Sequence, residues 1–284
     1  MLRPEMRRCR RLRRWLTSVR LAPEHPDAEK PVQPRRGLIR TAGLHLLWPW
    51  RCHLCGQDDP LAGGRPICAS CTASLHEDLL TSYCTRCGRE LADPVVATEL
   101  CPSCQNHPGH LDGLAIACRY RRLVRQCIVQ WKFSQCFGLE PQLVELLSDA
   151  MACQPWHRQV EALVPIPQPW TRWLKRRMIW PVRQLAEGLS RNTGHPVWPL
   201  LRARPHQQQV GLSRTRRLEN IRGVFRVAAG MDLTGKRLCL VDDVTTTGAT
   251  LQNAARILRK AGAAQVWGIV VAKSLGTPRH STGR

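Results

Sequence analysis

The stretch Arg237-Leu-Cys-Leu-Val-Asp-Asp-Val-Thr-Thr-Thr-Gly-Ala-Thr250 decides the fold class of this 284-residue chain. After Arg237, the four residues 238–241 form an apolar run that is typical of a buried strand. Two acids follow, then a hydroxyl-rich turn with Gly248, and then apolar residues at helical spacing from Leu251 to Ala261. A second apolar run, residues 266–271, comes after Gly262. This order of strand, helix and strand predicts a parallel βαβ unit.

Strand and helix patterns also alternate upstream of this unit. Residues 111–120 predict a strand, and a helix follows to about Lys132 with its apolar residues on one side. Pro141 and Pro181 each stand where a further helix would begin, and the apolar run 160–166 predicts a strand between those two helices. We therefore expect an α/β domain with a parallel sheet over residues 111–275.

The acids and the turn of the βαβ unit have the chemistry of a ligand site. Asp242 and Asp243 come at the expected carboxyl end of a strand, where open α/β sheets bind their ligands. The turn then begins a helix whose unpaired N–H groups favour a phosphate. Carboxylates can take the vicinal hydroxyls of a sugar, directly or through Mg²⁺. The run therefore predicts a site for a phosphorylated sugar.

Other interpretations of the run explain less of it. A helix capped by threonine, with an acid in its first turn, accounts for one threonine and one aspartate only. Neither a dinucleotide-binding GxGxxG loop nor a Walker A loop is present in the sequence.

Eight of the fourteen cysteines form Cys-x-x-Cys pairs within residues 52–104. Two such pairs on tight turns can converge on one Zn²⁺ ion, and four filled ligand positions leave no place for a catalytic water. The spacing favours pairing the first pair with the second and the third with the fourth, although an interleaved arrangement is an alternative. We therefore predict two structural zinc sites, with the ligands Cys52, Cys55, Cys68, Cys71, Cys84, Cys87, Cys101 and Cys104.

Four disulfides are the rival interpretation, and they would require an oxidising compartment. The chain start has many arginines but no continuous apolar segment, which argues against a secretory signal. A redox role for the pairs is less favoured, because four copies suit a scaffold better than a catalyst. Six further cysteines in unrelated contexts also weaken the disulfide interpretation.

The chain is strongly basic, with 43 Lys and Arg against 21 Asp and Glu and a formal net charge of +22. This charge suggests a polyanionic partner, with a solvated cationic surface as the alternative. Residues 1–45 are arginine-rich and then proline-rich, so we expect a basic, disordered extension there. No apolar stretch is long enough to span a bilayer, and we expect a cytoplasmic protein without membrane insertion.

Residues 241–250 resemble the phosphoribosyl-pyrophosphate (PRPP) motif of type I phosphoribosyltransferases. The order of further motifs resembles the ComF/GntX family of bacterial competence and DNA-utilisation proteins over about residues 48–275. Those motifs are the paired cysteines, Tyr120 with Trp131-Lys-Phe133, Val164-Pro-Ile-Pro167, and Asn220-Ile-Arg-Gly-Val-Phe225. The resemblance implies a type I phosphoribosyltransferase-like parallel sheet with helices on both faces, preceded by a small double zinc-ribbon module at residues 48–108.

The resemblance also implies roles for individual residues. Asp242 and Asp243 would be the catalytic acids at the ribose hydroxyls of PRPP, with Mg²⁺ as the second cofactor beside zinc. The 5′-phosphate loop would be Thr245, Thr246, Thr247, Gly248, Ala249 and Thr250, and the mobile loop over the site would contribute Arg216, Arg217, Asn220 and Arg222. Family members commonly have Gly-Phe-Asn-Gln where this chain has Met178-Ile179-Trp180-Pro181, which puts the pyrophosphate side of the site in question.

The function implied is binding of PRPP or a related phosphorylated ribose in DNA uptake or utilisation during natural competence. One alternative is an active phosphoribosyltransferase of nucleotide metabolism, an enzyme of pentosyl transfer with an unknown acceptor. Another alternative is a non-catalytic module for single-stranded DNA, with Trp170, Trp173 and Trp180 stacking on bases. Single-stranded DNA and competence proteins are the further partners that these interpretations imply.

Overall fold

The computed structural model describes residues 51–57, 66–91, 100–133, 137–167, 180–203, 224–228 and 230–274. The expected extension at residues 1–45 lies outside the described residues, as do Trp170, Trp173, Met178 and Ile179. The four residues assigned to the mobile loop, Arg216, Arg217, Asn220 and Arg222, also lie outside them.

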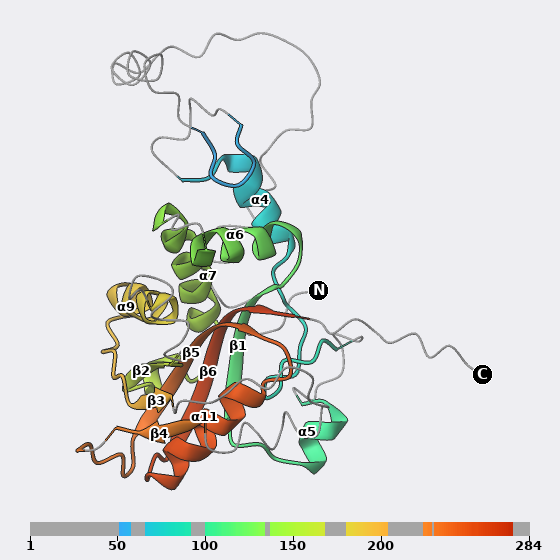
Figure 1. The fold of residues 1–284 in the computed structure, drawn as a ribbon. Coiled ribbons are helices and arrows are strands. Elements are labelled where there is room, and N and C mark those ends of the chain that lie inside the picture. Colours follow the sequence, from blue (N-terminus) through green and yellow to red (C-terminus); the bar gives the residue numbers. More distant parts are fainter. Residues whose placement is uncertain are drawn as a thin grey trace.

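A four-stranded parallel sheet forms the centre of the molecule (Figure 1). Its strands run in the order β1 (Gly113–Arg119), β6 (Gln265–Lys273), β5 (Arg237–Thr245) and β2 (Ala162–Pro165). Most positions in these strands are buried, which matches the nearly continuous apolar runs that parallel strands need when both sheet faces are covered.

Helices cover both faces of the sheet, as expected (Figure 1). On one face, α7 (Glu140–Ala152) and α9 (Pro181–Thr193) pack against strand residues that include Cys239 and Val241. On the other face, α11 (Ala249–Lys260) packs against Leu238 and Leu240. Alternate residues of β5 therefore enter two different hydrophobic clusters, as a strand in a three-layer fold must. The α/β fold class predicted from the sequence is confirmed.

Several shorter elements complete the described part of the chain. Helix α6 (Arg122–Phe133) follows β1, and the turns η1 (Phe137–Leu139) and η2 (His157–Gln159) flank α7. Strands β3 (Leu201–Ala203) and β4 (Phe225–Val227) form a separate antiparallel pair. Among the helices of the described ranges, none is long and apolar enough to cross a membrane.

The cysteine-rich segment packs directly onto the sheet. It contains the helices α4 (Ala69–Glu77) and α5 (Pro102–Asn106). Residues 78–85 run along the outer edge of β1: Arg119 N donates to Asp78 O at 2.7 Å, and Ile116 N donates to the Tyr83 hydroxyl at 3.1 Å. Leu80 N completes the contact with a 3.0 Å hydrogen bond to Ala117 O. The free edge of β1 is thereby covered, which protects it from pairing with another chain.

Candidate ligand site and metal centres

Strand β5 is longer than the apolar run predicts. It extends through Asp242 and Asp243 to Thr245, because β6 continues beside it: Asp242 pairs with Val270, and Thr245 pairs with Lys273. Apolar patterning ends at residue 241 because the next two side chains are acidic, although the backbone hydrogen bonding does not change there. The two acids therefore lie within the last four residues of the strand rather than after it.

Asp243 is buried and paired. Its side chain is 8% exposed, and one carboxylate oxygen forms an ion pair with the ammonium of Lys132 on α6. The other oxygen accepts a hydrogen bond from Val244 N at 2.6 Å. A buried carboxylate requires this kind of compensation, because removal from water costs several kcal/mol per ion. Asp243 is thus held in place by α6.

Asp242 is partly exposed as a residue, but its carboxyl group is largely desolvated by the surrounding protein. One of its oxygens accepts a hydrogen bond from Asp243 N at 2.9 Å. Burial and the charge of Asp243 raise the pKa of Asp242 to about 8, although Lys132 and the hydrogen bond from Asp243 N act in the opposite direction. The Lys132 ammonium is already paired with Asp243, so a cation bound beside Asp242 would favour its ionised form.

The turn after β5 is open at the start of α11. Gly248 is the N-cap residue with φ +80°, a left-handed conformation, and no side chain caps the helix. A methyl group at Gly248 would meet nothing within 4 Å, so space remains next to the turn. Thr246 and Thr247 are exposed, and the Thr247 hydroxyl accepts a hydrogen bond from Ala249 N at 3.3 Å. The alternative of a helix capped by a threonine at its N-cap therefore does not describe this turn.

The residues assigned to the phosphate loop are divided among three elements. Thr245 is the last residue of β5 and is buried; residues 246–248 form the turn; and Ala249 and Thr250 lie in the first turn of α11. The exposed hydroxyls and the uncapped helix start can therefore face one anion, while Thr245 belongs to the strand.

Two lysines at this site had no role assigned from the sequence. Lys132 ends the apolar stripe of α6 and contacts Asp243. Lys273 ends β6, is 6% exposed, and donates from Nζ to the carbonyl oxygens of Thr246 and Cys87. A single lysine at the end of an apolar element was the available signal in both cases, but only the tertiary structure shows which groups they reach.

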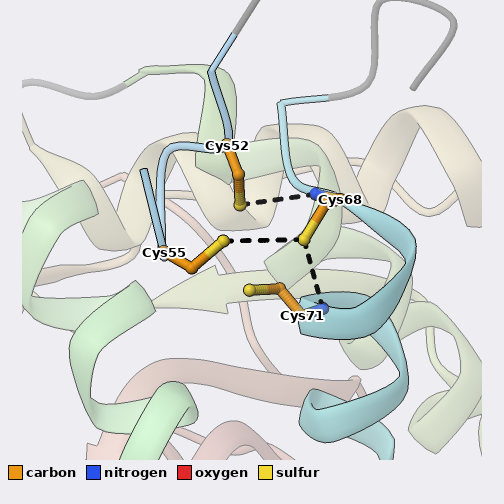
Figure 2. Close-up of side chains that lie close together, drawn as sticks. All are labelled: Cys52, Cys55, Cys68 and Cys71. Carbon is orange, nitrogen blue, oxygen red and sulfur yellow. Dashed lines mark hydrogen bonds between the residues drawn. The ribbon is translucent and has the colours of Figure 1, made fainter. Parts of the chain in front are cut away.

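The first cysteine group is shown in Figure 2, where four sulfur atoms point toward one centre. The Sγ atoms of Cys52, Cys55, Cys68 and Cys71 all lie within 4.8 Å of one another. Leu54 N and Cys68 N each donate to the Sγ of Cys52 at 3.4 Å. Burial acts to raise the pKa of Cys68, but hydrogen bonds from Ser70 and Cys71 outweigh it and lower that pKa to about 6. The pKa values of Cys55 and Cys71 are raised, so it is the convergence of the four sulfur atoms that fits a metal ion.

The second group consists of Cys84, Cys87, Cys101 and Cys104, whose Sγ atoms also lie within 4.8 Å of one another. Hydrogen bonding from Cys87, together with backbone N–H groups, lowers the pKa of Cys84 to about 4. The grouping is sequential, which is the arrangement that the spacing favours. The sulfurs of Cys87 and Cys101 are 3.7 Å apart, far beyond the ~2.05 Å of a disulfide. Each set of four thiols fits the tetrahedral coordination of structural Zn²⁺.

Two family models match different parts of the chain. The double zinc ribbon domain matches residues 43–105, and the phosphoribosyl transferase domain matches residues 184–282. The fold and the cysteine groups thus define a protein with a phosphoribosyltransferase-like domain and a double zinc ribbon.

Individual proteins that are similar to this chain have names that concern competence, DNA utilization and phosphoribosyl transfer. Competence protein F of Haemophilus influenzae is 29% identical over 215 residues, covering 72% of this chain and 89% of the relative. DNA utilization protein YhgH of Escherichia coli K12 is 29% identical over 236 residues, covering 78% and 97%. A purine phosphoribosyltransferase structure from Pyrococcus horikoshii is 16% identical, with coverage of 52% and 80% and a TM-score of 0.32. Over most of its length the chain is therefore similar to a competence protein and a DNA utilization protein, in agreement with the resemblance that its motifs indicate.

Proposed function

We propose that the carboxyl end of β5 and the start of α11 bind PRPP or a related phosphorylated ribose, and that the protein acts in DNA uptake or utilisation. The observation that carries the proposal is the open, uncapped turn at Gly248, which directly follows a strand with two acids. The second part of the proposal rests on the names of the relatives, a competence protein and a DNA utilization protein.

The residues of the site suit the two ends of such a ligand. The phosphate would contact the N–H groups of the first turn of α11 and the hydroxyls of Thr246 and Thr247, where the helix dipole favours an anion. The ribose hydroxyls would be bound by Asp242, the more accessible of the two acids. Asp243 would contribute by fixing the end of β5 next to Asp242, because its ion pair with Lys132 holds it in place.

Magnesium fits the same end of the strand. The raised pKa of Asp242 reflects burial beside a second carboxylate, and a divalent cation would relieve that unfavourable charge. When bound, Mg²⁺ would offset the charge of a pyrophosphate group. The residues of this chain would hold and orient the sugar, with Asp242 ionised and Asp243 fixed by Lys132.

Calorimetric titration of PRPP in the presence of Mg²⁺ tests this proposal. Asp242→Asn should weaken binding by about tenfold or more, because it removes a charged acceptor. Asp232→Asn is a matched control, since Asp232 is exposed, lies before the start of β5, and its hydrogen bonds are local ones from Thr234. No heat of binding with the unaltered protein would overturn the proposal. Pyrophosphate release in the same samples would identify an active transferase.

A second function, contact with single-stranded DNA, is favoured by a basic surface at the start of α6. Arg121, Arg122 and Arg125 are all exposed there. The first cysteine group lies next to this helix, because Gln126 donates to Leu54 O at 2.7 Å. Replacing Arg122 and Arg125 by Gln should weaken oligonucleotide binding and reduce its salt dependence. Affinity that does not change with salt would exclude this electrostatic contact.

A further inference from the structure

Lys273 connects the second cysteine group to the turn of the candidate ligand site. It is the last residue of β6, and its Nζ donates to Cys87 O at 3.2 Å and to Thr246 O. Cys87 is one of the four sulfur ligands of the second group, and Thr246 is the first residue of the turn. One side chain therefore connects the Cys84–Gly88 turn, which we call the second knuckle, to the turn that would receive a phosphate.

The ammonium of Lys273 depends on these two carbonyl groups. The residue is 6% exposed. A buried ammonium is tolerated only when hydrogen-bond acceptors replace the lost water. The backbone of Lys273 is also fixed, because its carbonyl accepts a hydrogen bond from Tyr120 N at 2.8 Å. Movement of either carbonyl would leave the charge partly uncompensated, so the two carbonyls are coupled through it.

The knuckle itself is packed closely on the sheet. Gly88, with φ +72°, follows Cys87, and a methyl group there would collide with Cδ1 of Ile116 and contact Cδ of Lys273 at 3.5 Å. The neighbouring Thr85 carbonyl accepts a hydrogen bond from Leu114 N on β1. The Cys84–Gly88 knuckle therefore rests on β1 and on the stem of Lys273.

The first cysteine group has a different connection. Its knuckle contacts α6, where Gln126 donates to Leu54 O at 2.7 Å. Among the hydrogen bonds of the described residues, none joins the first group to residues 245–250. The two groups are therefore not equivalent with respect to the ligand site.

We propose that Lys273 is a positioning residue that makes the second zinc ribbon a structural part of the ligand site. Zinc bound by the sulfurs of Cys84, Cys87, Cys101 and Cys104 would fix the backbone at Cys87. Lys273 joins the Cys87 carbonyl to the Thr246 carbonyl, and the turn would thereby be kept in the conformation seen here. The part of this inference that concerns ligand affinity rests on the proposed function, whereas the order of the turn does not.

The amides of Gln252 and Ser274 donate to Gly248 O at 2.9 Å and to Thr245 O at 2.8 Å, so their protection factors in hydrogen exchange report the order of the turn in the zinc-loaded full chain without ligand. Lys273→Met should lower these protection factors by about tenfold, and Lys273→Arg, which keeps the donor, should restore most of the protection. Lys260→Met is the matched control, because Lys260 is an exposed lysine at the end of α11. Unchanged exchange in Lys273→Met, with both zinc ions retained by metal analysis, would overturn the inference.

A comparison of the two cysteine groups gives a second, independent result. Cys101→Ser removes a ligand from the second group, and Cys55→Ser removes one from the first group. Only Cys101→Ser should speed exchange at Gln252 and Ser274, the two amides that bond to carbonyls next to the turn. Equal acceleration by both variants would mean general destabilisation, and would exclude a specific link through Lys273.

Ligand binding separates this inference from the proposed function. PRPP with Mg²⁺ should bind Lys273→Met about tenfold more weakly than the unaltered protein, as expected for a residue that positions the binding turn without contacting the ligand. If the unaltered protein binds no PRPP, the proposed function fails, while the exchange results still decide whether Lys273 orders the turn. If PRPP binds both proteins equally, the positioning role fails and the proposed function stands.

Discussion

Lys132 on α6 and Asp243 on β5 form a buried ion pair at the carboxyl end of the sheet, with side chains that are 18% and 8% exposed. The pair joins the helix that follows the first strand to the strand that carries the candidate ligand site. The pair therefore affects both the stability of the fold and the charge of the candidate ligand site, and different substitutions can separate these two effects.

Lys132→Met should lower the free energy of unfolding by about 3 kcal/mol, because it leaves the carboxylate of Asp243 buried without its counterion. The double variant with Asp243→Asn should recover part of this loss, which urea unfolding would measure. Arg183→Met is the control: Arg183 pairs with Glu187 at 2.8 Å on the exposed face of α9, and such pairs contribute about 0.3–0.5 kcal/mol. An equal loss of unfolding free energy in Lys132→Met and Arg183→Met would show that the buried Lys132–Asp243 pair contributes no more than an exposed pair does.

The dependence of stability on pH should report Asp242. Its pKa is raised from 3.8 to about 8 in the folded protein, chiefly by burial. Between these two values the folded protein retains a proton that the unfolded chain has lost, so the free energy of unfolding falls as pH rises through this range. Asp242→Asn removes this contribution. Relative to the unaltered protein, the variant should gain about 1–3 kcal/mol between pH 5 and pH 8.5.

Thermal unfolding at pH 5, 7 and 8.5 measures that gain as a difference between the two proteins, which cancels the titration of all other groups. A difference that is constant across the three pH values would contradict a raised pKa at Asp242. Added Mg²⁺ should reduce the pH dependence of the unaltered protein only, because a cation near the two acids favours the ionised form.

The sequence predicts the central βαβ unit well because residues 238–241 and 266–271 are apolar and buried on both faces. It does not predict the end of β5, since Asp242 and Asp243 interrupt the apolar pattern while the pairing with β6 continues. The cysteine spacing indicates both thiol groups, because tight local turns bring each Cys-x-x-Cys pair together. The contacts of Lys132 and Lys273 join elements that are more than 100 and 25 residues apart, respectively, so no local pattern reveals them.

Gly248→Ala should separate stability from ligand binding. The residue has φ +80°, so a methyl group costs about 1–2 kcal/mol of backbone strain although the space beside it is open. Gly194→Ala at the end of α9 is a close control, since Gly194 also has φ +80° and nothing within 4 Å of a methyl group. Both variants should lose similar stability in urea, and only Gly248→Ala should also weaken binding of PRPP. Equal binding by the two variants would remove the turn from the ligand site.

The two knuckle glycines offer the clearest test of how the zinc ribbons differ. Gly56 and Gly88 have the same φ of +72°, but a methyl group meets nothing within 4 Å at Gly56 and collides with Ile116 Cδ1 at Gly88. Gly56→Ala should therefore cost about 1–2 kcal/mol of backbone strain, as judged from the left-handed conformation alone. Gly88→Ala should cost about 1–3 kcal/mol more, because the side chain of Ile116 on β1 must be displaced to make room.

Unfolding in urea, with zinc content measured in parallel, distinguishes these costs. Metal loss from Gly88→Ala should come from the second group and should be accompanied by faster exchange at Leu114 and Ile116, whose N–H groups bond to Thr85 O and to the Tyr83 hydroxyl. Gly56→Ala should leave those two amides protected. If both variants expose the edge of β1 equally, the second ribbon does not cover that edge more firmly than the first, and the close packing at Gly88 carries no stability.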